Sequence, residues 1–344
     1  MFRYFIGSYI VTILGLFAAY LWGERVHPGA GLTSVFIAFV LAILEVSLSF
    51  DNAVVNAMKL EKMSEKWRHR FITWGILIAV FGMRFLFPLV VVAIFSRHNI
   101  LTVLNMAIND VNTYAHYLQI AHPPIITFGG AFLLMLFMDY FTENKDIFWI
   151  KPVEQKLLKL SSIRGICTLT TLCVLGILLN ILPLELRIPA LCSGVAGIIT
   201  YLIIDGTAEW LERRQEARAK LYADTVKCSG LIGFLYLELI DASFSLDGVL
   251  GAFALSKDII IITIGLFIGA MFVRSLTIML VEKKTLKQYL YLEHGAHWAI
   301  GTLAILMFIS SIHEVPEVVT GLLGLVFIIS ALISSIIHNR KERQ

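Results

Sequence analysis

Residues 45–52 read Glu-Val-Ser-Leu-Ser-Phe-Asp-Asn, and residues 241–248 read Asp-Ala-Ser-Phe-Ser-Leu-Asp-Gly. Both stretches follow the pattern acid-x-Ser-x-Ser-x-Asp, and each lies inside a long apolar run. The agreement continues downstream, because in each copy a glycine precedes an arginine by nine residues. These pairs are Gly75 with Arg84 and Gly265 with Arg274. The chain therefore contains an internal repeat that carries acidic residues.

The composition places this repeat in a membrane. Hydrophobic residues make up 58% of the 344 and charged residues 15%, whereas soluble domains have about 45–50% and about 25%. A helix needs about 20 apolar residues to cross a bilayer, and runs of that length recur along the chain. The alternation of membrane β-strands is absent. Because a helix satisfies its own backbone hydrogen bonds in lipid, the sequence predicts an all-α, polytopic transmembrane bundle.

Ten membrane spans are expected from the apolar runs. Their limits are roughly 5–22, 33–58, 71–95, 123–141, 162–182, 188–205, 229–255, 258–281, 292–312 and 317–337. The first is interpreted as a span because it is long for a secretory signal and lacks a clear cleavage site. One membrane domain would then consist of two repeats, residues 1–182 with spans one to five and residues 183–344 with spans six to ten.

The distribution of basic residues gives the chain a direction. Of its 28 Lys and Arg residues, 21 fall in alternate connecting segments and termini and only 4 fall on the opposite side. Because basic residues concentrate in cytoplasmic loops, both termini are expected in the cytoplasm. The two motif copies then cross the membrane in opposite directions, as inverted repeats do in secondary transporters. No basic domain is large enough to follow a nucleic-acid backbone, so no nucleic-acid partner is expected.

The repeated acids are the candidate site. A carboxylate at a helix centre in hydrocarbon costs at least about 2.5–3.5 kcal/mol, so its presence needs an explanation. Glu45 and Asp241 are expected near the midplane, with Asp51 about 9 Å toward the cytoplasm and Asp247 about 9 Å toward the outside. Six residues turn an ideal helix through about 600°, which leaves Glu45 and Asp51 on different faces, so either the helix unwinds near the serines or the ladder of acids bends around it.

Other oxygens accompany these carboxylates. Ser49 follows Glu45 by four residues, Ser245 follows Asp241 by four, and Asn52 adds an amide oxygen. An all-oxygen set suits a hard divalent cation such as Mn²⁺, Mg²⁺ or Ca²⁺. The sequence therefore predicts a metal-ion site, with a purely structural network of acids and arginines as the alternative.

Two further groups have two interpretations each. Arg84 and Arg274 lie inside spans, where they either balance the carboxylates when no cation is bound or hydrogen-bond backbone carbonyls. His294 and His297 share a face at the start of span nine, beside Glu293. They form either a gate or secondary metal site at the cytoplasmic mouth, or a set of interfacial polar groups.

Residues 45–54 and 241–249 closely resemble the paired signature of TerC-like integral membrane proteins, a family named for tellurium resistance and similar to the wider lysine-exporter group. The resemblance implies a link to manganese export, metal-ion homeostasis and tellurite resistance in bacteria. It points to Glu45, Asp51 and Asn52 in the first copy and to Asp241 and Asp247 in the second. Gly248 stands where the first copy has Asn52, so the second copy lacks an amide ligand.

The expected function is therefore export of a divalent cation, Mn²⁺ by resemblance, through alternating access in a bacterial inner membrane. The cation is the substrate, membrane lipid is a further partner, and no resident cofactor is expected. Two alternatives stay open: a non-transporting scaffold of a metal-resistance or secretion complex, and an exporter of a small organic solute. An intramembrane aspartyl hydrolase is disfavoured because Asp51 and Asp247 would lie about 18 Å apart in depth, so no enzymatic activity is expected.

Overall fold

The computed structural model describes residues 2–75, 78, 82, 85–222, 233–235, 237–238, 252, 255–256, 258–283, 289–313, 315 and 317–342. All of the regular secondary structure in these residues is helical. Six of the helices are long and apolar enough to cross a membrane. The predicted class, an all-α membrane bundle, is confirmed at this level, and the count of ten spans stays a prediction.

The first half of the chain supplies most of the shorter helices. They are α1 (Phe2–Val26), α2 (Gly31–Leu48), α3 (Phe50–Lys62), α4 (Glu65–Arg70), the π-helical turn η1 (Phe71–Gly75), α5 (Phe87–Ser96), α6 (Ile100–Asn109), α7 (Val111–Thr142), α8 (Lys151–Leu160) and α9 (Ile166–Ile181). The second half contributes α10 (Leu184–Tyr222), α12 (Ile259–Glu282), α13 (Leu292–Ser310) and α14 (Glu317–Glu342).

Two predicted span limits differ from the observed helices. Helix α7 begins at Val111, well before residue 123, and carries Pro123 and Pro124 in its interior. Helix α10 runs to Tyr222 without interruption, past the predicted end at residue 205. The reason is that a hydropathy limit marks where the apolar stretch ends, whereas Ala, Glu and Arg after residue 205 continue a helix readily in water.

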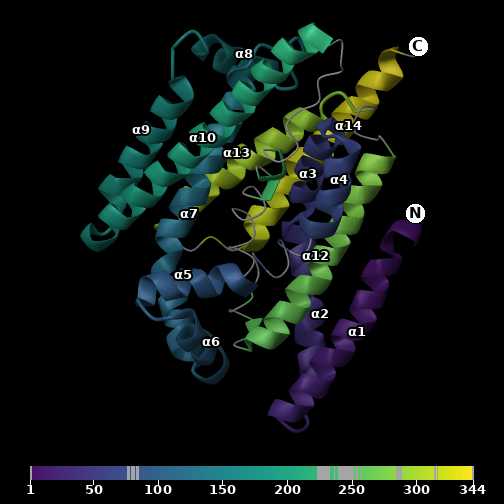
Figure 1. Cartoon of the computed structure of the whole chain (residues 1–344), viewed down its shortest axis with the longest axis vertical. Coiled ribbons are helices and arrows are strands. Elements are labelled where there is room, and N and C mark those ends of the chain that lie inside the picture. The colour runs from purple at the N-terminus through teal and green to yellow at the C-terminus, as the bar shows by residue number, and fades with distance from the viewer. Residues whose placement is uncertain are drawn as a thin grey trace.

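The helices pack side by side across the molecule in Figure 1. Helices α9 and α10 form one edge, α7 and α13 the centre, and α14, α2, α12 and α1 lead to the opposite edge. The apolar windows of α7 and α13 are 72% and 67% buried, whereas that of α1 is 11% buried. Large side chains of α1 such as Ile13 and Phe17 are exposed, as lipid-facing positions require.

Glycines allow the closest approach of α2 and α12. Gly265 and Gly269 form a Gly-x-x-x-Gly pattern on α12. A Cβ on Gly265 would lie 2.6 Å from the Cβ of Leu41 and 2.8 Å from the carbonyl oxygen of Ala38. Small residues at this spacing let two membrane helices meet backbone to backbone. This contact brings the first motif of the chain against the helix that follows the second motif.

Candidate functional site

Glu45 is buried where α2 meets α12. Its side chain is 2% exposed, and a Cβ added to Gly269 would lie 2.5 Å from the Glu45 Cβ and 2.6 Å from its Cγ. Gly269 therefore supplies the space in which Glu45 lies against α12. The burial agrees with the expectation that this acid faces the interior of the bundle and not lipid.

The helix that carries Glu45 breaks at Ser49. Helix α2 ends at Leu48 and α3 begins at Phe50, while Ser49 has φ −100° and ψ 15°. The Ser49 hydroxyl donates a 2.7 Å hydrogen bond to Oε1 of Glu45. Of the two alternatives that the sequence left open, an unwound helix or a bent ladder of acids, the structure shows a local departure from helix geometry at Ser49. Glu45 and Ser49, paired by their i, i+4 spacing, are in contact. The result is a carboxylate and a hydroxyl oxygen together at a break in a membrane helix.

Several other predicted site residues lie outside what the structure describes. The backbone of Asp51 and Asn52 belongs to α3, but their side chains lie outside the described residues, and so do the whole of Arg84, Asp241, Ser245 and Asp247. Arg274 is half-buried on α12, and its Nε has no hydrogen-bond partner among the described residues. The roles assigned to all of them stay predictions.

A further buried acid lies one turn before Asp241. Glu238 is 6% exposed, and a Cβ on Gly75 would lie 2.9 Å from its Oε1. The carboxylate of Glu238 thus rests on the last residue of η1, at the start of predicted span three. A residue of the second motif span again contacts a glycine that follows the other motif.

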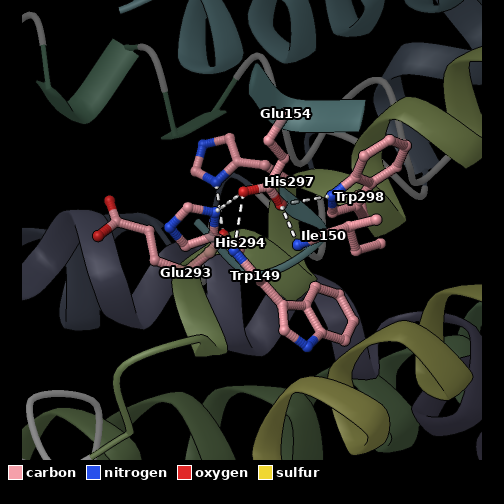
Figure 2. Close-up of polar contacts among 7 residues, drawn as sticks. All are labelled: Trp149, Ile150, Glu154, Glu293, His294, His297 and Trp298. Atoms are coloured by element: carbon pink, nitrogen blue, oxygen red, sulfur yellow. Dashed lines mark hydrogen bonds and ion pairs between the residues drawn. The ribbon is translucent and has the colours of Figure 1, made fainter. Parts of the chain in front are cut away.

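Figure 2 shows a separate polar cluster around Glu154 of α8, whose side chain is 1% exposed. The backbone N–H groups of Trp149 and Ile150 donate to it at 2.8 and 3.1 Å. The indole N–H of Trp298 donates at 3.0 Å, and Nδ1 of His294 lies 3.1 Å from Oε2. Donors from the segment before α8 and from α13 therefore converge on one carboxylate.

This environment keeps Glu154 ionised. Burial raises the pKa of its carboxyl, but the contact with His294 at 3.1 Å and the hydrogen bonds from Trp298 and Ile150 more than offset that effect. The resulting pKa is lowered from 4.5 to about 2. Hydrogen bonds to the charged form of an acid have this effect generally. Glu154 is thus a carboxylate at any physiological pH.

His297 lies beside this cluster with its ring 3.5 Å from that of Tyr140, in a stacked arrangement. Its Nδ1 lies 2.8 Å from the backbone oxygen of Glu293. Both histidines are buried on α13. Among the described residues, no group of three or more His, Cys, Asp or Glu side chains is arranged to hold a metal ion. A secondary metal site at this mouth stays a prediction.

Sequence reasoning did not identify Glu154, Trp298 or Glu238. Glu154 lies in a charged connecting segment, where an acid looks like any solvated residue. The available signal was on α13, because His294 and Trp298 are four residues apart and both carry N–H donors that need a buried acceptor. Glu238 lies inside a predicted span, where any acid needs a partner or a function.

The chain belongs to the family described as Protein of unknown function (DUF475), whose sequence profile matches residues 50–342. The match covers the second motif, every helix from α3 to α14 and the Glu154 cluster. No curated protein matches the chain significantly. No solved structure matches it significantly either.

Proposed function

We propose that this member of the DUF475 family is a secondary transporter that exports a divalent cation, with Mn²⁺ as the expected substrate. The observation that carries the proposal is Glu45, which is 2% exposed in an apolar bundle. Its carboxylate lies at a break in its own helix together with the Ser49 hydroxyl. Secondary transporters place substrate and ion sites at such discontinuous helices near the bilayer midplane.

The chemistry of this position favours a hard cation. A carboxylate and a hydroxyl contribute oxygen atoms only, which are the ligands that Mg²⁺, Ca²⁺ and Mn²⁺ prefer. The structure describes two of the expected oxygens, those of Glu45 and Ser49. Asp51, Asn52, Asp241 and Asp247 are proposed to complete the set as the ion moves along the path.

Contacts between the two halves support the inverted-repeat part of the proposal. Helix α2, which carries the first motif, packs on α12, the helix that follows the second motif. Glu238, next to the second motif, packs on Gly75 in the segment that follows the first motif. Each motif span thus contacts the helix after the other motif, as two copies related by a two-fold axis in the membrane plane would do.

The arrangement of the connections supports the proposed orientation. In Figure 1, α8 and the C-terminal ends of α10 and α14 gather at one end of the bundle, while α6 and the turn between α1 and α2 lie at the other. The first end carries the segments rich in Lys and Arg. We therefore assign it to the cytoplasm of a bacterial cell, in line with the resemblance to TerC-like proteins.

Transport of labelled Mn²⁺ into proteoliposomes tests the proposal. The Glu45→Gln variant is expected to lower the initial rate at least about tenfold, since each 1.4 kcal/mol of lost binding is a factor of ten. Glu185→Gln is the matched control, because Glu185 is exposed at the start of α10 and should leave the rate unchanged. Folded wild-type protein that moves no Mn²⁺, Mg²⁺, Ca²⁺ or Zn²⁺ would contradict the proposal and favour the scaffold alternative.

A further inference from the structure

The two motif spans differ in polarity at several matched positions, and three of these differences lie near the repeated acids. With residue 45 aligned to residue 241, the pairs are Ala42 with Glu238, Asn52 with Gly248 and Asn56 with Ala252. One member of each pair is polar and the other is small and apolar. The two halves of the path therefore differ in chemistry although the spans are copies.

In the proposed orientation the polar members of these three pairs lie on the cytoplasmic side, whereas Ser34, which is matched to Gly230, lies toward the outside. Span two runs inward, so Asn52 and Asn56 lie about 10 Å and about 16 Å on the cytoplasmic side of Glu45. Span seven runs outward, so Glu238 lies about 4–5 Å on the cytoplasmic side of Asp241. The small members of the three pairs lie correspondingly toward the outside.

The structure shows tight apolar packing on the outer side. Ala252 is fully buried and packs with Leu41, Ile262 and Leu266. The carbonyl oxygen of Ala42 would lie 2.8 Å from a Cβ on Gly269. The backbones of α2 and α12 therefore lie close together beside Glu45.

The cytoplasmic side has buried polar groups at the matched positions. Asn56 and Glu238 are 5% and 6% exposed. A Cβ on Gly233 would lie 3.4 Å from the Met63 sulfur, which brings the start of span seven against the end of α3.

The Glu238 carboxylate packs against Gly75, where a side chain would not fit. The 2.9 Å distance from a Cβ on Gly75 to Oε1 means that the carboxylate lies directly on the η1 backbone. Phe234, one turn earlier, packs edge-on against Phe71 at the start of η1, with ring centroids 6.0 Å apart. Single π-helical turns occur frequently at functional sites. Gly75 in this turn leaves room for the Glu238 carboxylate. At the matched position of the first motif span, the residue is Ala42.

We infer that Glu238 is a cation-binding residue on the cytoplasmic half of the path, with no counterpart on the outer half. The inference rests on the proposed function and deepens it, because it gives the path a direction. A hard divalent cation arriving from the cytoplasm meets a carboxylate in addition to amide oxygens before it reaches Glu45, and such oxygens replace its hydration shell. An ion arriving from outside meets only small apolar residues at the matched positions.

The inference is tested by comparing the apparent affinity for Mn²⁺ at the two faces of the membrane. Uptake of labelled Mn²⁺ is measured in inside-out and right-side-out membrane vesicles, so that the half-saturating concentration is obtained separately for each face. Glu238→Gln is expected to raise the cytoplasmic value about tenfold, equivalent to about 1.4 kcal/mol of binding. The outer half-saturating concentration and the maximal rate should stay within about twofold. Glu238→Asp keeps the charge and should restore most of the cytoplasmic affinity.

A glycine substitution keeps the test valid if Glu238→Gln does not fold. Gly75→Ala displaces the carboxylate without removing it, so it should raise the cytoplasmic half-saturating concentration alone. Gly176→Ala is its control, because no heavy atom lies within 4 Å of a Cβ at that position.

The outcomes separate this inference from the proposed function. Wild-type vesicles that take up no Mn²⁺ through either face would remove the proposed function and this inference with it. Wild-type transport with Glu238→Gln unchanged, or with both faces weakened equally, would overturn the inference alone and leave the export proposal standing.

Discussion

Glu45 and Glu154 are both buried acids, but their surroundings differ in kind. Glu154 is contacted by nitrogen donors from Trp149, Ile150 and Trp298 and by the imidazole of His294. The Glu45 carboxylate accepts a hydrogen bond from the Ser49 hydroxyl. An N–H donor occupies a carboxylate lone pair and repels a cation, whereas a hydroxyl oxygen can turn its own lone pair toward one.

The described contacts of Glu154 favour a structural role, whereas the hydroxyl beside Glu45 fits the role in transport that is proposed for it. Glu154 fastens the segment before α8 to α13 in a single arrangement. Glu45 lies beside the Ser49 hydroxyl, at the position where α2 ends. Burial alone, which is equal for the two residues, would not distinguish them. The following experiments test whether the contrast holds, starting with the largest expected change.

The first substitution removes the charge of the structural acid. Glu154→Gln is expected to lower the free energy of unfolding by about 3–5 kcal/mol, because three buried N–H donors lose their charged acceptor and each hydrogen bond to a charged group contributes about 1.5–3 kcal/mol. Thermal unfolding in detergent measures the loss, and Glu65→Gln, at an exposed site in α4, serves as the control. A loss below about 1 kcal/mol would place Glu154 among ordinary surface acids.

Removing one donor should give a smaller effect. Trp298→Phe deletes the indole N–H and keeps ring contacts with Phe137 and Phe141, whose centroids lie 5.4 and 5.2 Å away. We expect a loss of about 1.5–3 kcal/mol, as for a hydrogen bond to a charged group. Trp74→Phe is the matched control because Trp74 is 63% exposed. Equal losses in the two variants would show that ring size, not the N–H, matters.

Acid should weaken the same cluster with a defined sign. The pKa of Glu154 is lowered from 4.5 to about 2 in the folded protein, so its contribution is fully present above pH 4.5 and is lost as the pH falls toward 2. The difference in unfolding temperature between wild type and Glu154→Gln should therefore narrow over this range. A difference that stays constant down to pH 2 would contradict the assigned hydrogen bonds.

The smallest change in stability is expected for a substitution of Ser49, the hydroxyl partner of Glu45. Ser49→Ala removes the hydroxyl that donates to Glu45 and should cost about 0.5–1.5 kcal/mol. It should also weaken Mn²⁺ transport, since an oxygen ligand is lost. Ser47→Ala is an internal control, because the Ser47 hydroxyl is exposed and donates to the carbonyl oxygen of Ile43. Equal effects of the two substitutions on transport would contradict the assignment of Ser49.

Patterns within one helix predicted more of this molecule than patterns between helices. Composition predicted the helical class and the spacing of Glu45 and Ser49 predicted their pairing, whereas the turn between Glu45 and Asp51 left open whether the helix unwinds near the serines. The Glu154 cluster was missed because its partners lie far along the chain, with Trp298 separated from Glu154 by 144 residues. Periodicity carries no signal for such a contact, and neither does charge.

The contact of Glu238 with Gly75 was missed for a related reason. The repeat directs attention to positions that the copies share, whereas Glu238 stands where the first copy has Ala42. Departures from internal symmetry become informative only when packing shows which helix lies opposite. Here that helix is η1, and the glycine that ends it makes room for the carboxylate.

The separation of Glu154 from its partners also orders events during synthesis. The ribosome completes α8 long before it reaches His294 and Trp298, so the nascent chain holds a carboxylate whose α13 donors do not yet exist. The contacts of Glu154 with His294 and Trp298 therefore form only after α13 has been translated, although α8 can pack on α7 before that.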